Sequence, residues 1–597
     1  MQELKKWSDG FGFFLRNKIY MAFLSLTAVC SYGFLVTHQT VGIDDTPYAY
    51  YFEEGLNAIV GRWFLYLANK VFHVAEFSPF MTDLAGVLIL MAAAVVWCCL
   101  LRSVCGERVP LWGYTFFGCI FISCPLISEV YTYYLHNGVS VGYLCTGLSL
   151  CFFQELKELS GFKRDRKQEA GCRKREAESR KREAESRKRE AESGKREAKG
   201  GLRLLAAGLG STAFLWIALG CYESFMIVWL LGVILVLLTE KYMGVPGRVF
   251  FSLAAAAGAA VVAIVLRSAM ISLVIAVFGL GGMRDEAVQR SVTEMLGWIF
   301  EEGAAAEFAM VARRFYVMYG VFAYAYYPVK IFVYASAFML VFSVWRGLRQ
   351  RSAWIPALTV GGFGVCFLLA VIEGKATYYR TAQFLPLICG YGAFLLVYAV
   401  QGLKAWRKES VAKGAFSRAA GGAVFLVLCT VLWNQCFDMN RWFYVDWMKY
   451  QAAVETVGQI ALELEKGFDT SKPVIFTGKY EVPREIIADA YVSYGSETFY
   501  KLKRWTDPLD EHLLEKFYRS YGVWVAQTPE LSVIEWGRNA FGDDSELARF
   551  FAMHGHELTP YTESENYHEI EVYSLGLPGF PREGSIVDRG DYIVVHF

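Results

Sequence analysis

The chain has little charge for its length. Charged residues make up only 20% of the 597 residues, against 55% hydrophobic ones, and the mean hydropathy is +0.30. This balance argues against an ordinary soluble domain. The net charge of +1 gives no indication of binding to nucleic acid, because the charged residues are segregated along the chain, and we expect no nucleic-acid partner.

Cysteine is missing from the end of the chain, and several catalytic motifs are missing altogether. All 14 cysteines lie at or before Cys436, so a disulfide-stapled tail is excluded, and no CxxC metal pair is present. The lack of a Walker loop argues against an ATP-driven pump. HExxH is also missing, and no GxSxG or dinucleotide-binding motif is expected in the strand–helix context that it needs.

Long apolar runs dominate what is present. A bilayer core about 30 Å thick needs about 20 apolar residues in a helix. We count eleven such runs, at Ile19–Val36, Phe80–Leu101, Leu111–Ser128, Val139–Phe153, Leu204–Cys221, Phe225–Leu238, Val249–Phe278, Ile331–Val344, Trp354–Ile372, Phe384–Val400 and Ala420–Cys436. The first reads as an uncleaved signal anchor, because no small-residue cleavage site follows it. The pattern predicts a mainly α, polytopic membrane domain over residues 1–436.

Lysines and arginines set the expected orientation. Lys5, Lys6, Arg16 and Lys18 precede the first span and place the N-terminus in the cytoplasm. Alternation then puts five basic connections inside. These are Arg102 with Arg108, the Lys157–Arg203 insert, Lys241 with Arg248, Arg346 to Arg351, and Lys404 to Arg418. An odd number of spans places the tail and the first loop outside.

A charged repeat interrupts the membrane domain at residues 154–203. Arg173–Ser179 recurs at Arg180–Ser186 and Arg187–Ser193. The seven-residue period lacks the apolar positions of a coiled coil. We interpret the insert as a solvated charged helix or loop on the cytoplasmic side, whose basic residues could contact anionic lipids.

The first outer loop carries two adjacent carboxylates, Asp44 and Asp45, before Thr46-Pro47. Asp45 could cap a helix that begins near Pro47. Capping needs only one carboxylate and leaves Asp44 without a role. The segment Tyr48–Phe72 has an apolar stripe at helical spacing and predicts an amphipathic helix on the membrane surface. A carboxylate above such a helix could meet the head group of a lipid-borne substrate.

Other outer connections hold further candidates. Glu129 and His136 flank a tyrosine-rich turn after the third span, and Tyr222-Glu223 nearly fills the turn between the fifth and sixth spans. Ionisable groups at such positions usually face a cavity or a partner. Glu223 could equally be a helix cap. Arg380 could bind a phosphate or anchor the chain at the interface, and the sequence does not decide between them.

The pattern Gly42-Ile43-Asp44-Asp45-Thr46, followed by Gly61-Arg62-Trp63, resembles the bacterial Gtr-type glucosyltransferases. These are membrane enzymes of the GT-C superfamily that modify O-antigen and related surface glycans. Further agreement lies in Tyr222-Glu223, in the Arg380 turn before Pro386, and in the tail segment Lys472–Gly478. The resemblance covers most of the chain outside the charged repeat.

The resemblance implies a polyprenyl-phosphate-linked glucose donor, a surface glycan acceptor and transfer with inversion, in a bacterial cell membrane. Asp44 or Asp45 would be the general base, while Arg62 and Arg380 would bind the phosphate. Trp63 belongs to the same motif. The family has glutamine near position 223, so Glu223 departs from its pattern. A divalent cation held by Asp44 and Asp45 is compatible with the sequence, and no other cofactor is implied.

The carboxylates and arginines of the outer loops are the residue types that such a transfer requires. It needs a carboxylate to accept the proton of the acceptor hydroxyl, cationic groups for the departing phosphate, and a groove that aligns donor and acceptor. Two rivals remain. A transporter or flippase of lipid-linked sugars would need charge within the spans, where only Arg267 lies. A non-catalytic scaffold would not need the aspartates.

The tail, residues 437–597, has an ordinary globular composition and predicts an extracytoplasmic α/β domain. We expect helices at Asp446–Lys466, from Pro483, and at Ser545–His554. Strands are expected at Val474–Thr477, Val523–Ala526, Ile570–Ser574 and Tyr592–Phe597. His554 and His556 near Asp543 and Asp544 have no third ligand at convincing spacing, so a metal site there is disfavoured.

Overall fold

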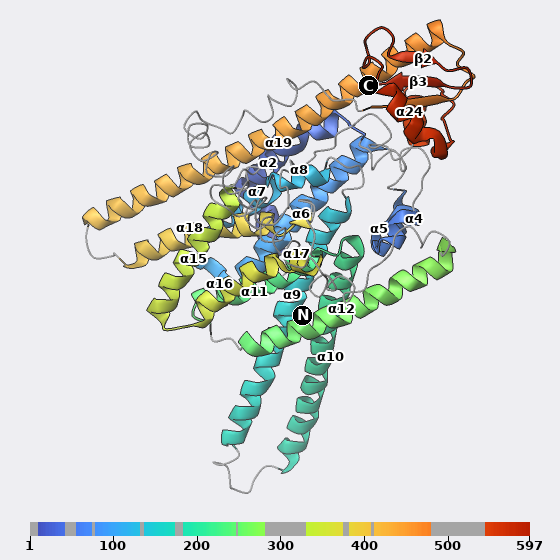
Figure 1. The fold of residues 1–597 in the computed structure, drawn as a ribbon. Helices are drawn as coiled ribbons and strands as arrows, with labels where there is room; N and C mark the ends of the chain where they lie inside the picture. The colour runs from blue at the N-terminus through green and yellow to red at the C-terminus, as the bar shows by residue number, and fades with distance from the viewer. Residues whose placement is uncertain are drawn as a thin grey trace, which may run out of the picture.

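The computed structural model describes residues 10–41, 55–73, 78–131, 137–173, 183–245, 249–280, 330–373, 381–406, 411–478 and 544–597. These residues are mainly helical, as predicted, with one small sheet near the C-terminus. Figure 1 shows a bundle of helices with two projections. The helix pair α9 (Asn137–Arg173) and α10 (Glu183–Cys221) extends from one end, and the C-terminal sheet lies at the other.

Nine helices of the described residues are long and apolar enough to cross a membrane. Besides parts of α9 and α10, they are α2 (Lys18–Thr37), α6 (Pro79–Cys105), α11 (Phe225–Tyr242), α12 (Val249–Phe278), α15 (Lys330–Gln350), α18 (Leu385–Trp406) and part of α19 (Val411–Gly467). Every predicted run coincides with a helix. Two are shorter than a span: α7 (Leu111–Ile122), followed by α8 (Leu126–Tyr131), and α16 (Trp354–Cys366), followed by α17 (Leu368–Glu373). The eleven-span count therefore stays a prediction.

The outer surface of the bundle is apolar. Phe250 of α12, Leu26 of α2 and Val341 of α15 are 77%, 62% and 69% exposed. Apolar side chains exposed in such numbers along long helices suit contact with lipid rather than water. A membrane environment follows from this surface together with the length of the helices.

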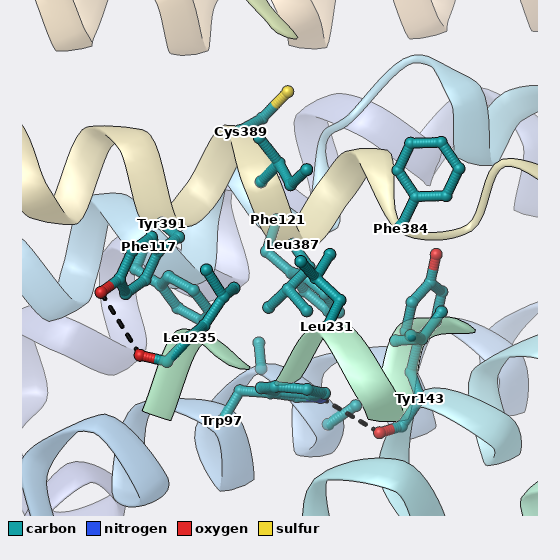
Figure 2. Close-up of a cluster of buried hydrophobic side chains, with 14 of the residues drawn as sticks. Trp97, Phe117, Phe121, Tyr143, Leu231, Leu235, Phe384, Leu387, Cys389 and Tyr391 are labelled. Atoms are coloured by element: carbon teal, nitrogen blue, oxygen red, sulfur yellow. Dashed lines mark hydrogen bonds between the residues drawn. The ribbon is translucent and has the colours of Figure 1, made fainter. Parts of the chain in front are cut away.

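The centre of the bundle is filled by rings (Figure 2). Trp97 of α6 donates its indole N–H to the carbonyl of Tyr143 on α9, at 3.1 Å. Tyr391 of α18 donates its hydroxyl to the carbonyl of Leu235 on α11, at 3.4 Å. The polar end of each buried ring thus meets a backbone acceptor, which burial requires. These contacts join α6 to α9 and α11 to α18 inside the membrane domain.

The predicted surface helix is broken, so its prediction as one continuous helix is wrong. It consists of α4 (Gly55–Ile59) and α5 (Trp63–Phe72). Gly61, at φ 90°, ends α4 by donating its N–H to the Ala58 carbonyl, while the Arg62 N–H reaches the Asn57 carbonyl at 2.8 Å. Glycine favours this left-handed helix ending. The first part of the predicted stripe, from Tyr48, lies outside the described residues.

The last membrane helix continues into the tail. α19 runs unbroken through residue 437, and its part beyond Ala453 packs against a separate apolar core that includes Val457, Ile460 and Phe551. The sheet has the strand order β1-β3-β2, with β1 (Val474–Thr477) parallel to β3 (Ile593–His596) and β2 (Ile586–Asp588) antiparallel to it. β1 and β3 confirm two predicted strands, and α23 (Asp544–Met553) confirms a predicted helix.

One predicted strand of the tail is a helix. Ile570–Ser574 lies in α24 (Tyr567–Ser574). The alternation of Ile570, Val572 and Ser574 suggested a strand, but only Ile570 and Ser574, four residues apart, are buried, while Val572 is 54% exposed. Burial therefore follows the helical repeat. The predicted elements at Pro483 and Val523–Ala526 lie outside the described residues.

A salt bridge holds the base of the α9–α10 projection to the bundle. The Lys157 ammonium on α9 lies 2.9 Å from both carboxylate oxygens of Glu240 on α11, and Gln154 donates to the same carboxylate at 2.8 Å. Both charged side chains are largely buried, with 12% and 7% of their surfaces exposed. The pair therefore compensates two charges that burial would otherwise penalise.

We expect Lys157→Met to lower the free energy of unfolding by about 3–5 kcal/mol, because it leaves the Glu240 carboxylate buried without its cation. Adding Glu240→Gln removes that charge, keeps a hydrogen-bonding amide and should restore most of the loss. Thermal unfolding of the purified protein in detergent measures both. Equal midpoints for the single and double variants would contradict this account.

Candidate functional site

The candidate site lies where α5 meets the ends of α9, α10 and α12. Trp63 begins α5 and is 3% exposed, and its ring packs at a tilt of 30° against Trp216 of α10, with 4.5 Å between the centroids. Trp63 and Tyr66 of α5 also share an apolar cluster with Ile271 and Val274 of α12. The expected surface segment is therefore buried by protein on this face, rather than by lipid alone.

Four charged or aromatic side chains converge at the turn between α10 and α11. The Arg62 guanidinium lies over the Tyr222 ring, 4.3 Å from its centroid. Arg267 of α12 donates to the Glu223 carboxylate and to the Leu219 carbonyl, each at 3.1 Å. Arg62 and Arg267 are near enough to act on each other electrostatically. Two guanidiniums against one carboxylate leave this cluster with a net positive charge.

The same turn contacts the start of α18. Ser224, which follows Glu223, donates its hydroxyl to the Gln383 side-chain carbonyl at 2.7 Å. Tyr143 of α9 donates to the Gln383 backbone carbonyl at 2.6 Å. The Gln383 amide nitrogen is buried and has no hydrogen-bond partner in the described part of the chain. The site is therefore formed where five elements meet: α5, α9, the α10–α11 turn, α12 and the start of α18.

A buried polar group lies near the start of α6, at α8. The Tyr131 hydroxyl of α8 hydrogen-bonds to Ser140 of α9, and the Asp83 carboxylate of α6 is close enough to act on Tyr131. Asp83 is only 6% exposed. Ser140 lies within Gly138-Val139-Ser140-Val141-Gly142 on a helix, so this sequence does not form the strand–turn–helix elbow that a nucleophilic serine needs.

The structure brings together four of the predicted residues: Arg62, Trp63, Tyr222 and Glu223. Asp44, Asp45, His136 and Arg380 lie outside the described residues. Glu129 belongs to α8, but the orientation of its side chain is not described. The roles of these residues therefore stay predictions.

Arg267 and Asp83 were missed as site residues. The sequence placed Arg267 inside an apolar run without a partner, whereas the structure pairs it with Glu223. A lone arginine in an apolar run is itself a signal, because membrane helices hold such charges only when a neighbour compensates them. Asp83 is the fifth residue of α6, close enough to the start of the helix that a carboxylate there is usually explained by the helix dipole.

His554 of the tail has structural partners. His554 hydrogen-bonds through Nδ1 to the Phe550 carbonyl at 2.9 Å, and its Nε2 lies 3.3 Å from the Tyr450 hydroxyl. The Asp544 carboxylate accepts the Phe476 N–H at 3.2 Å. No group of three possible metal ligands occurs among the residues that the structure describes.

Comparison with known proteins identifies the membrane part of the chain. The family model described as glucosyl transferase GtrII matches residues 33–397. The match spans α4, α5, the α10–α11 turn and α12, and it ends before α19 and the C-terminal sheet. No curated protein and no solved structure matches the chain.

The packing of Trp63 against α10 gives a direct test of the site. A Cβ atom at Gly220 would lie 2.5 Å from the Trp63 ring, so Gly220→Ala must displace Trp63 and the start of α5. We expect at least a tenfold loss of glucosyl transfer by an inserted, folded protein. The matched control is Gly208→Ala on the same helix, where the nearest atom would be 3.9 Å away.

Proposed function

The chain belongs to the GtrII glucosyltransferase family, and on this premise we propose that it moves glucose from a polyprenyl phosphate to an outer surface glycan. The enzyme lies in a membrane, and we place it in the bacterial cell membrane with its active site on the outer face. A sugar already linked to phosphate needs no nucleotide at the site, which agrees with the lack of nucleotide-binding motifs in the sequence.

The observation that carries the proposal is the positive cluster of Arg62 and Arg267 beside Tyr222 and Glu223. When the sugar–phosphate bond breaks, negative charge grows on the departing phosphate. Fixed guanidiniums stabilise that charge without reorganising, and their planar donors suit phosphate oxygens. We assign Arg62 and Arg267 to the donor phosphate, and Arg380 stays a predicted third member.

Two local contacts hold these guanidiniums in place. Arg267 caps the last turn of α10 through the Leu219 carbonyl, and Glu223 neutralises part of its charge. Arg62 follows the Gly61 break, and its backbone N–H is bound by the Asn57 carbonyl. A site held by helix ends and not by free loops is suitably rigid for electrostatic catalysis.

The reaction itself needs one base. The acceptor hydroxyl oxygen attacks the anomeric carbon, the bond from that carbon to the phosphate oxygen breaks, and polyprenyl phosphate departs with the electron pair. Asp44 or Asp45 takes the proton of the attacking hydroxyl. Inversion at the anomeric carbon follows from attack opposite the departing phosphate. A divalent cation held by the two aspartates remains a hypothesis.

The shape of the protein supports the proposed orientation. The α9–α10 projection, which carries the charged insert, and the C-terminal sheet lie at opposite ends of the molecule (Figure 1). A basic insert in the cytoplasm then leaves the tail and the α10–α11 turn on the outer side. The pairing of Arg267 with a residue at that turn also weakens the transporter alternative, because its charge reaches the end of a span.

We expect Asp44→Ala or Asp45→Ala to lower glucosyl transfer by about 10²–10⁴-fold, the range typical of a lost general base, with normal insertion in the membrane. Transfer from a radiolabelled polyprenyl-phosphate glucose to the surface glycan measures this. Asp591→Ala, at an exposed carboxylate in the tail, is the matched control. If both single variants decorate the glycan at the wild-type rate, neither aspartate is the base.

The orientation has its own test. In a cysteine-depleted background, an impermeant thiol label applied to intact cells should reach Thr46→Cys and not Ser186→Cys, because the first loop is outside and the repeat is inside. Permeabilised cells should label both positions, which controls for reactivity. The reverse pattern in intact cells would put the proposed active site on the wrong side of the membrane.

A further inference from the structure

One face of α5 carries Arg62, Leu65 and Asn69. Residues three, four and seven apart share a helix face, so the three side chains follow one line along α5. Leu65 lies against the start of α9, because a Cβ at Gly138 would be 3.4 Å from the Leu65 Cδ2. Arg62 lies over Tyr222. This face of α5 therefore points toward the α10–α11 turn and the start of α9.

The end of this line is a buried amide that binds none of the described residues. Asn69 is 1% exposed, and neither its carbonyl oxygen nor its amide nitrogen has a partner among the described residues. A buried amide without hydrogen bonds is costly, and folded proteins rarely keep one. A leucine at this position would avoid that cost, so the polar side chain calls for an explanation beyond the contacts of the described residues.

A second amide with the same property lies beside Arg62. Asn57 is 2% exposed, and its amide nitrogen has no partner in the described part of the chain. The backbone carbonyl of Asn57 accepts a hydrogen bond from the Arg62 backbone N–H at 2.8 Å, which places the two residues in one turn. The indole nitrogens of Trp63 and Trp216 are also buried, and they too have no hydrogen-bond partner among the described residues. Unused donors therefore gather around the proposed phosphate site.

We infer that Asn69 and Asn57 form the subsite that binds the hexose of the donor, while Arg62 binds its phosphate. The inference rests on the proposed function and deepens it. A side-chain amide both donates and accepts hydrogen bonds, as a sugar hydroxyl does. Two side-chain amides can therefore bind neighbouring hydroxyls of one sugar. Asn69 lies seven residues beyond Arg62, about 10 Å along the helix, and this separation lets one ligand place its phosphate and its far hydroxyls on the two ends.

The experiment compares two ligands on the full chain in nanodiscs. One is a polyprenyl phosphate, and the other is the same lipid carrying glucose on its phosphate. The ratio of their dissociation constants isolates what the sugar contributes. The wild type should bind the glucose-bearing lipid more tightly. Asn69→Leu should reduce that preference about tenfold, the effect of one lost hydrogen bond of ordinary strength, while leaving the affinity for the bare lipid within about twofold.

Two further variants serve as controls. Arg62→Met should weaken both ligands by a similar factor, since both carry the phosphate. Thr146→Val removes a buried hydroxyl that also has no partner in the described chain. Thr146 lies further along α9, away from the α10–α11 turn, so its substitution should change neither affinity. Asn69→Leu should also unfold at a temperature no lower than the wild type, because it removes an unpaired polar group.

The outcomes separate this inference from the proposed function. If the wild type binds neither lipid, the proposed donor is wrong and the hexose subsite is rejected with it. If the wild type prefers the glucose-bearing lipid and Asn69→Leu keeps that preference, the donor stands and the subsite is wrong. Equal weakening of both lipids by Asn69→Leu would show a general effect on shape, which also overturns the assignment.

Discussion

The arrangement of the candidate site depends on how a guanidinium is accommodated in a membrane helix. Arg267 lies in an apolar helix of 30 residues, where an unpaired charge would cost several kcal/mol. It is compensated by the Glu223 carboxylate and by the Leu219 carbonyl at the end of α10. Both partners belong to the α10–α11 connection, so this requirement fixes α12 against that turn. The apolar contacts of Ile271 and Val274 with Trp63 and Tyr66 then set where α5 lies.

Close approach between these elements is made possible by small residues. Gly220 of α10 leaves room for the Trp63 ring, which would lie 2.5 Å from a Cβ at that position, and Leu65 packs against Gly138 at the start of α9. In a membrane there is little hydrophobic drive between helices, so dense packing and buried hydrogen bonds must hold them together. The bulky rings of α5 and the glycines beneath them therefore act as one packed unit. It is this unit that presents Arg62 to Tyr222.

The sequence was a good guide to the helices and a partial guide to the site. The eleven apolar runs all fall on helices, because hydrophobicity over about 20 residues is a strong signal in a membrane protein. The break at Gly61 was missed, since an apolar stripe continues through it and only the backbone bonds of Ala58 and Asn57 reveal the helix end. The pair Arg267–Glu223 was missed because 44 residues separate its members, and helical periodicity says nothing about contacts between helices. Arg62, Trp63 and Tyr222 were found through their resemblance to the glucosyltransferases, and the structure adds that they touch the same turn.

The break at Gly61 explains how one short segment can serve two ends of a ligand. A continuous helix would bury the Arg62 N–H in its own ladder and carry the chain straight on. The glycine ending instead turns the chain, leaves Arg62 as the first residue before α5, and aims it at Tyr222. From there α5 runs on for two turns to Asn69 along the face that packs toward α9. An arginine at a helix start and an amide further along the same helix thus follow from a single left-handed residue. The order Gly-Arg-Trp then has a physical reason: the glycine turns the chain, the arginine lies over Tyr222 where it would face the proposed donor phosphate, and the tryptophan fastens the helix to α10.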